Sequence, residues 1–252
     1  MERRGQIGVF VIIAIVIVAI VIVFVLMRDV RLPGTEERET PQQFFSSCME
    51  SAVKPIVAEI ADQGGYRNPE GFIVYNETKI PYLCYTSEYF KPCIIQQHDP
   101  LGNFEHVLNE VLALEAERCA SEFESAFEAR GYSVSRADTK VNVSFAPRQL
   151  LLEIAAPMTL SRDVSRTYKT FELSYKSEYY ELLAIATSIL DFESTYGDSE
   201  TTTYMRYYPD LTIQKTKLSD GSKIYTLSNV VTNERFTFAT RSLALAAGYL
   251  TQ

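Results

Sequence analysis

The 252-residue chain has no tryptophan, only two histidines, only four cysteines and no long run of basic residues. Nucleic-acid binding needs Lys and Arg clustered against the phosphates, whereas this chain carries 24 Lys and Arg against 32 Asp and Glu. We therefore expect no nucleic-acid partner. With 46% hydrophobic and 22% charged residues, the chain is also neither a disordered tail nor a collagen-like repeat.

The short motifs that mark common catalytic sites are missing as well. The sequence contains no P-loop, no G-x-G-x-x-G, no H-E-x-x-H and no G-x-S-x-G. It also lacks the closely spaced ligand pairs, such as C-x₂-C, of structural zinc sites. His98 and His106, with Asp99 and Glu105, surround the expected start of a helix, and solvated surface residues are the default interpretation of this group. We expect no cofactor, no metal and no catalysis; the alternative is an envelope enzyme that uses His98 or His106.

The longest uncharged stretch lies close to the N-terminus. Residues 7–27 are 21 consecutive uncharged residues, of which fourteen are Ile or Val. As a helix they would measure ~31 Å, which matches a bilayer core of ~30 Å. A cleaved signal peptide has an apolar region of about 7–15 residues followed by a small-residue cleavage site, neither of which is seen here. We therefore expect an uncleaved transmembrane helix in contact with the lipid bilayer, rather than a signal peptide or a buried core helix.

The basic residues that flank this segment do not decide its orientation, because two Arg precede it and two follow it. All four cysteines come after the segment, which suits an oxidising compartment. Two possible glycosylation sequons, at Asn76 and Asn142, also follow it. We therefore predict a single-pass protein of the cell membrane, with residues 1–6 inside and the C-terminal domain outside.

The outer part divides into a stalk and one domain. Residues 28–41 contain two Pro, one Gly and mixed charges, which is typical of a short stalk, and residues 42–252 form the expected extracytoplasmic domain. From residue 32 onward the chain carries 20 Lys and Arg against 30 Asp and Glu. Anionic lipid headgroups repel such an acidic domain, so we expect it to stand off the membrane.

Apolar periodicity predicts that this domain is α+β. Helical spacing predicts helices from Pro41 to the Gly64-Gly65 pair, over about 101–130 and over about 178–194. Alternation and short apolar runs predict strands at 72–75, 80–85, 141–145, 150–154, 171–175, 211–218, 223–227 and 235–240. Because helices and strands come in runs, we expect mainly antiparallel strands covered by helices on one side. Pro81 cannot donate to a ladder, which predicts an edge position for strand 80–85.

The four cysteines suggest two disulfides. Cys48 falls on the apolar face of the first helix and Cys119 on that of the second, so a bond between them would join the two helices. Cys84 and Cys93 flank a loop that contains proline. Three connectivities are possible, and this one pairs residues in comparable surroundings; buried free thiols are the alternative. In the chain-entropy model the two bonds would stabilise the fold by roughly 4 and 3 kcal/mol.

A polar stretch over 194–210 is the expected contact surface. It is rich in Ser, Thr and Tyr, and its candidate contact residues are Tyr196, Tyr204, Met205, Arg206, Tyr207 and Tyr208. Tyr and Arg are enriched at interface hot spots because they combine a large contact area with a polar group. The alternative is a mobile loop whose tyrosines fold back onto the sheet. We predict an interaction or structural module of the cell envelope, whose partner is an envelope or extracellular protein or glycan.

Arg4-Gly5-Gln6, followed at once by the apolar run, resembles the short signal of archaeal type IV pilin-like proteins. That resemblance implies cleavage after Gly5 and packing of the apolar helix in a filament core. The chain as a whole resembles an uncharacterised group of archaeal single-pass membrane proteins, through the same start, Cys48, Gly64-Gly65-Tyr66, Cys119 and the F-x-F-A-x-R sequence over 236–241. This second resemblance implies single-pass topology and a Cys48–Cys119 bond, with no established activity.

An uncleaved anchor and a pilin-like subunit predict different N-termini. Cleavage after Gly5 would place a charged amine in the filament core, where it needs a partner. Pilin-like proteins usually supply a Glu five positions into the mature chain, where this chain has Phe10. We expect protein extracted from its native membrane to retain Met1 through Gly5 in an intact-mass measurement. A mass lower by residues 1–5 would instead establish pilin-type processing.

Overall fold

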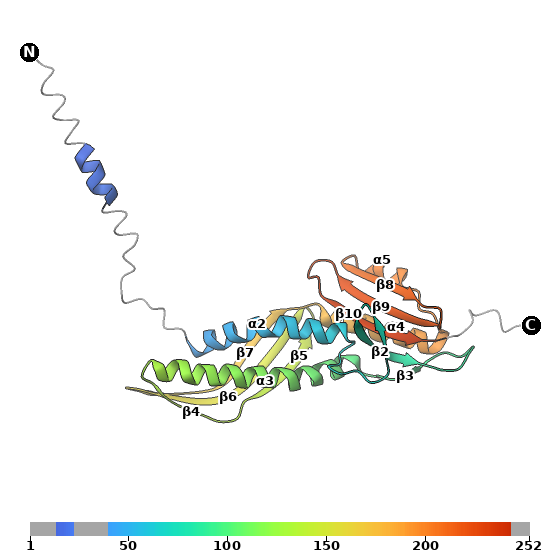
Figure 1. The fold of residues 1–252 in the computed structure, drawn as a ribbon, viewed down its shortest axis with the longest axis horizontal. Coiled ribbons are helices and arrows are strands. Elements are labelled where there is room, and N and C mark those ends of the chain that lie inside the picture. The colour runs from blue at the N-terminus through green and yellow to red at the C-terminus, as the bar shows by residue number, and fades with distance from the viewer. Residues whose placement is uncertain (1–13, 23–39, 243–252) are drawn as a thin grey trace, which may run out of the picture. The chain divides into compact units, whose positions relative to one another are not determined.

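The computed structural model describes residues 14–22 and 40–242 (Figure 1). The chain forms two compact units, which meet in sequence between Thr40 and Pro41.

The first unit is described at residues 14–22, which are helical and carry exposed Ile and Val side chains. The rest of the expected membrane helix over 7–27, and the stalk up to residue 39, lie outside the described residues. Within the part of the chain that is described, none of the helices combines the length and the apolar character that a membrane span requires.

The second unit is α+β, as predicted. Its helices are α2 (Pro41–Asp62), α3 (Pro100–Ala129), α4 (Tyr179–Tyr196) and α5 (Thr202–Tyr207). Its strands are β1 (Phe72–Tyr75), β2 (Thr78–Tyr85), β3 (Ile94–Ile95), β4 (Ser133–Arg136), β5 (Lys140–Ala146), β6 (Gln149–Ser161), β7 (Ser165–Lys176), β8 (Leu211–Lys217), β9 (Ser222–Asn229) and β10 (Arg235–Arg241). Every strand pairing among the described residues is antiparallel except that of β2 with β10.

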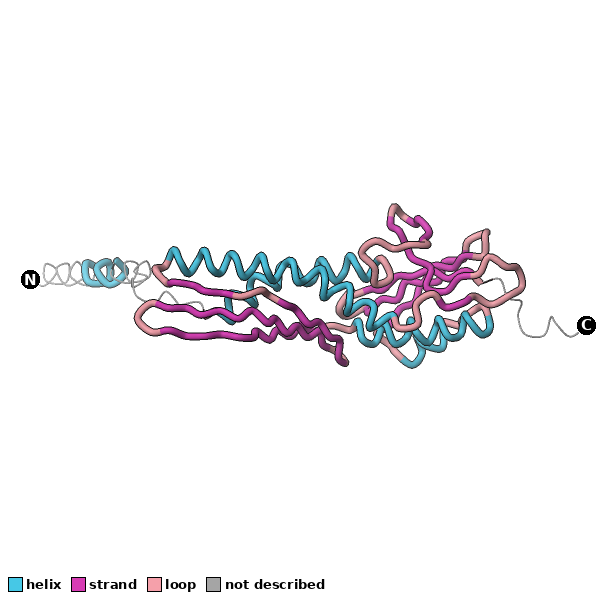
Figure 2. Tube along the Cα trace, turned by 90° about the horizontal axis from the view of Figure 1, so that it is seen from below, coloured by secondary structure: helices cyan, strands magenta, loops and turns pink. Residues whose placement is uncertain are grey.

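One sheet contains β4 to β7. The long strand β6 pairs with β7 on one side, and with β5 and then β4 on the other. Helices α2 and α3 lie side by side along one face of this sheet (Figures 1 and 2). Their apolar stripes are buried against it, and the ring of Phe45 stacks on that of Phe171 with centroids 4.2 Å apart. The predicted bond between Cys48 and Cys119 joins the two helices, with Cα atoms 6.0 Å apart.

The other sheet has the order β1-β2-β10-β9-β8, with β3 also paired to β2. Helix α4 packs against β2, β9 and β10, so that Leu227, Phe236 and Phe238 are buried beneath it. The predicted second disulfide, Cys84–Cys93, closes the loop between β2 and β3. A hairpin joins β8 to β9, with Gly221 at φ 87° in its turn.

Phe104 of α3 connects the two sheets. Its ring is fully buried and lies 5.2 Å from Phe145 of β5, 5.6 Å from Tyr179 of α4 and 6.3 Å from Phe236 of β10. The two sheets therefore share one hydrophobic core around this ring.

The prediction that Pro81 confines β2 to a sheet edge is wrong. Strand β2 lies between β1 and β10, and Pro81 is paired with Phe72 of β1. The ladder with β10 begins only at Tyr82, which is paired with Ala239. Because Tyr82 donates its N–H toward Gly71 on the β1 side, the Pro81 nitrogen faces the β10 side, before that ladder begins. Because the ladder with β10 begins after Pro81, the lack of an N–H group on this proline removes no hydrogen bond between the two strands.

Three short elements were missed, and two strands are longer than predicted: β6, and β7, which was expected over 171–175 and runs from Ser165 to Lys176. The missed elements are β3, β4 and α5, each of six residues or fewer. The strand predicted over 150–154 continues to Ser161, because the register shifts between Ala155 and Met158 and thereby accommodates Pro157 in a bulge. The residues after Ser242 lie outside the described part of the chain.

Two glycines with the same backbone angle test how tightly α2 is packed at its C-terminal end. Gly64 and Gly71 both have φ +62°, but a Cβ on Gly64 would lie 2.5 Å from Pro81 Cγ and 3.2 Å from the Thr237 carbonyl oxygen, whereas one on Gly71 would meet nothing within 4 Å. We expect Gly71→Ala to lower the free energy of unfolding by about 1–2 kcal/mol through backbone strain alone. Gly64→Ala should lower it by about 1–3 kcal/mol more, because its methyl group must displace neighbours. Equal losses in urea unfolding would show that this packing is loose.

Candidate functional site

The candidate contact segment, residues 194–210, begins where α4 ends. Gly197 adopts φ 85° and donates its N–H to the Glu193 carbonyl oxygen at 3.0 Å, which closes the helix. This left-handed residue turns the chain back, so that Asp198 and Ser199 face the strands β8 and β9. The position of the segment is therefore set by what holds residues 197–199.

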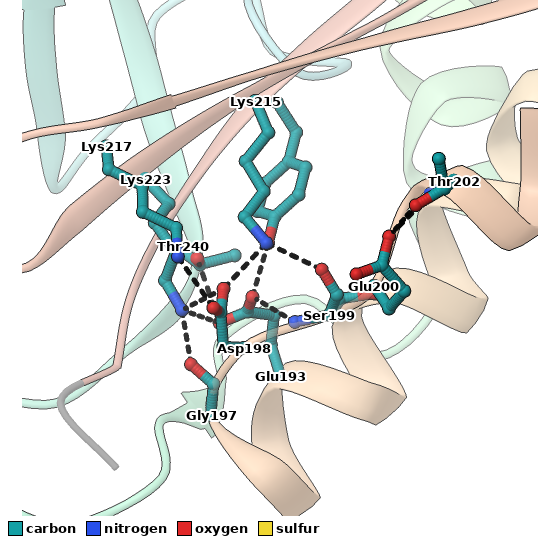
Figure 3. A network of polar contacts seen from close by, with 11 residues as sticks. Glu193, Gly197, Asp198, Ser199, Glu200, Thr202, Lys215, Lys217, Lys223 and Thr240 are labelled. Carbon is teal, nitrogen blue, oxygen red and sulfur yellow. Dashed lines mark hydrogen bonds and ion pairs between the residues drawn. The ribbon is translucent and has the colours of Figure 1, made fainter. Parts of the chain in front are cut away.

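A buried ion pair holds residues 197–199 in place. Glu193 is completely buried, and its Oε2 accepts from Lys223 Nζ at 2.5 Å and from Thr240 Oγ1 at 3.3 Å (Figure 3). Its Oε1 accepts from the Ser199 N–H at 2.9 Å and from the Tyr225 hydroxyl. Burial and the neighbouring Glu193 raise the pKa of Tyr225, so the hydroxyl stays protonated and donates. Both carboxylate oxygens are thus satisfied, which is the condition under which a buried charge is tolerated.

A second, more exposed layer of charges surrounds this pair. Asp198 binds Lys215 Nζ at 2.7 Å and Lys217 Nζ at 2.7 Å, and Lys215 also donates to the Ser199 carbonyl oxygen at 2.6 Å. Partial burial acts to raise the pKa of Asp198, but the hydrogen bonds from Lys215 and Lys217 outweigh it, so the pKa lies below its ordinary value. Together these residues form what we call the Glu193 network: Glu193, Asp198, Ser199, Lys215, Lys217, Lys223, Tyr225 and Thr240 (Figure 3).

The network was missed in the sequence, although a signal for it was present. Glu193 follows Ala186, Ile189 and Leu190 at helical spacing, so it falls on the buried stripe of α4. An acid at such a position needs a buried cation, and Lys223 lies in a strand between residues that are otherwise mostly buried and uncharged. What the sequence could not provide is that the two lie side by side, because 30 residues separate them.

The structure divides the six candidate contact residues into two groups. Tyr204 hydrogen-bonds to Ser188 of α4 at 2.8 Å, and the sulfur of Met205 accepts from the Ile213 N–H at 3.3 Å, so both fold back onto the domain. The other four are exposed: Tyr196, Tyr207 and Tyr208 at 59%, 75% and 50% exposure, and Arg206. The candidate residues that a partner could reach are thus Tyr196, Arg206, Tyr207 and Tyr208.

Within the chain segments that the structure describes, the two histidines belong to no group of metal ligands. His98 is exposed in the loop before α3, and exposed His106 lies 3.5 Å from Glu110 on the same helix. Their acidic neighbours have structural roles, because Asp99 caps α3 through the Gly102 N–H and Glu105 accepts from the Phe145 N–H. Among the described residues, no group of three or more His, Cys, Asp or Glu is placed to hold a metal ion.

Both sequons are accessible. Asn76 is exposed in the turn between β1 and β2, at φ 47°, and Asn142 is exposed on β5. Glycosylation of either residue stays a prediction.

A second exposed aromatic group was missed. Tyr89 and Phe90 are 69% and 68% exposed in the loop that the Cys84–Cys93 disulfide closes, and Ile94 is exposed beside it. The sequence feature that indicates this group is an aromatic pair between two cysteines, in a segment for which the sequence predicts only a loop.

The Glu193 network can be tested by removing its charges one at a time. Lys223→Met leaves Glu193 buried without its cation, so we expect the free energy of unfolding to fall by about 3–5 kcal/mol. Adding Glu193→Gln should restore at least half of this loss, because the amide oxygen still accepts from Ser199 and Tyr225. Lys217→Met is the control: this lysine is exposed, and its loss should cost less than about 1 kcal/mol. If Lys223→Met and Lys217→Met unfold at the same urea concentration, the buried pair does not hold the segment.

No family model, curated protein or solved structure matches this chain. The fold and the site are therefore established from the chain's own residues. The two resemblances noted from its sequence motifs rest on those motifs alone.

Proposed function

We propose that the chain is a membrane-anchored, non-enzymatic interaction module of the cell envelope, with residues 7–27 in the bilayer and the α+β unit outside. Three features support this proposal. The uncharged N-terminal run has the length of a span, and its described part is a helix with outward Ile and Val side chains, as lipid contact requires. The second unit contains two disulfides, which persist in oxidising compartments.

The observation that carries the interaction role is the set of exposed tyrosines on a segment that is held at two places. The Glu193 network holds its start at residues 197–199, and hydrogen bonds of Tyr204 and Met205 hold it further on. Large exposed aromatic side chains remove much apolar area from water on binding, and their hydroxyl groups still form hydrogen bonds. A segment that is already fixed loses less conformational entropy when a partner binds. These properties support a protein or glycan partner that docks on Tyr196, Arg206, Tyr207 and Tyr208.

A pilin-like filament subunit is the second candidate function, favoured by Arg4-Gly5-Gln6 before the apolar run. In a filament the apolar helices pack against one another, and small residues at every fourth position favour such packing in lipid. Here Gly8, Ala14 and Ala19 are spaced by six and five. Bulky Ile and Val nearly all round the helix instead suit lipid contact, which favours the monomeric anchor.

The interaction role can be tested with the full-length protein in lipid nanodiscs as bait for envelope extract. We expect Tyr207→Ala with Tyr208→Ala to reduce the capture of a specific partner at least tenfold, which corresponds to a loss of about 1.4 kcal/mol. Quantitative mass spectrometry for proteins and glycan profiling for polymers would measure the capture.

Tyr89→Ala with Phe90→Ala is the matched control. It removes two aromatic rings of similar exposure from a different loop of the same unit. We expect this variant to capture the same partner as the unaltered chain. Loss of capture only in this control would move the contact surface to the disulfide-closed loop, and unchanged capture in both variants would contradict an aromatic contact surface.

A further inference from the structure

A cleft of about 570 Å³ lies in the second unit, between α2, the end of β7 and the turn that joins β9 to β10. Its apolar wall is formed by Val53, Val57, Leu150 and Val231. Small-molecule sites typically measure about 300–1,000 Å³ and combine such a wall with a few convergent polar groups. The volume of this cleft therefore lies within the range of sites that bind small organic molecules.

One polar group in the cleft has no partner. The hydroxyl oxygen of Tyr175 is buried and makes no hydrogen bond within the described chain. Burial, with a smaller effect of Glu50, raises the pKa of Tyr175 to about 12, so this hydroxyl is a donor at neutral pH. Buried tyrosine hydroxyls nearly always have a partner. This donor has almost no exposed surface in the ligand-free structure, and a ligand that brings an acceptor to this part of the cleft wall would give it a partner.

The acidic groups that line the cleft already have hydrogen-bond partners within the fold. Asp62 binds Arg235 through two hydrogen bonds, each of 2.5 Å. Glu234 accepts from the Glu178 N–H at 2.6 Å and from Thr232 Oγ1 at 3.0 Å. Both acids are therefore occupied within the fold.

Lys54 and Lys176 also line the cleft, and both are exposed. Neither makes an ion pair with a carboxylate of the described residues. The residues that line the cleft thus include two lysines without an ion pair and a tyrosine whose buried hydroxyl has no partner, beside an apolar wall.

We propose that this cleft binds a small organic carboxylate with an apolar body. The carboxylate would accept from Tyr175 and face Lys54 and Lys176, while the body covers the Val53, Val57 and Leu150 side chains. A singly charged head fits better than a phosphate dianion, because Arg235, the guanidinium that lines the cleft, is already held bidentately by Asp62. This site is separate from the tyrosine surface, so its test is independent of the proposed interaction role.

The test uses the full-length chain in lipid nanodiscs, with 3-phenylpropanoate as the probe and 3-phenylpropanamide as its neutral analogue. Saturation-transfer NMR, with empty nanodiscs as the blank, measures binding. We expect the propanoate to bind at least tenfold more tightly than the amide. We further expect Tyr175→Phe, Lys54→Gln and Lys176→Gln each to weaken its binding severalfold, because each removes one group that the carboxylate contacts.

Tyr175→Phe separates a binding role from a structural one. The hydroxyl has no partner in the fold, so its removal should leave the urea midpoint of the ligand-free protein unchanged or higher. Lys140→Gln, which alters an exposed lysine outside the cleft lining, is the control and should bind the probe like the unaltered chain. Equal affinity for propanoate and amide, no detectable binding of either, or unaltered binding in all three cleft variants would overturn the proposal.

Discussion

The contacts of the Phe104 ring join the two halves of the second unit. Its aromatic neighbours belong to β5, α4 and β10, which otherwise lie in different layers. Neither sheet could bury its apolar face fully without the helices that pass from one to the other, and α3 does so with a side chain that is completely buried. The helix pair, the sheet of β4 to β7 and the sheet of β1, β2 and β8 to β10 are therefore one cooperative core rather than two domains.

This shared core explains the place of both polar sites. At one end of α4, Tyr179 packs against Phe104 and lines the cleft. At the other end, the carboxylate of Glu193 pairs with Lys223 of β9 in the second sheet. The aromatic packing that fixes α4 thus fixes the cleft and the start of the contact segment together.

Local sequence patterns predicted most of the elements. Helices α2, α3 and α4 and most of the longer strands each bury one face, so their apolar residues recur at a regular spacing. The same helix faces suggested the Cys48–Cys119 bond, and the short loop between Cys84 and Cys93 suggested the other, among three possible connectivities. The rule that assigns proline to edge strands failed at Pro81, since it does not include where a neighbouring ladder begins. Short elements such as β3 and α5 are too brief to show a period.

The cleft could not have been predicted at all. Its walls come from α2, from the ends of β6 and β7 and from the turn around Val231, segments that are far apart in the chain. No periodicity or motif relates such segments. Only the folded arrangement shows that Lys54, Tyr175 and Lys176 line one space.

The two polar sites differ in one respect that separates a structural role from a binding role. In the Glu193 network both carboxylate oxygens of the buried acid and the ammonium group of Lys223 have partners. The Ser199 hydroxyl of this network has no partner, but Ser199 is completely buried and lines no part of the cleft. In the cleft the acids are occupied, but the Tyr175 hydroxyl and two lysines are not. Folding favours satisfied groups and tolerates an unsatisfied one at a cost of about 1–3 kcal/mol. A donor left unpaired at the wall of an open cleft regains that free energy when a ligand supplies the acceptor, which is why the proposed ligand site is assigned to the cleft and not to the network.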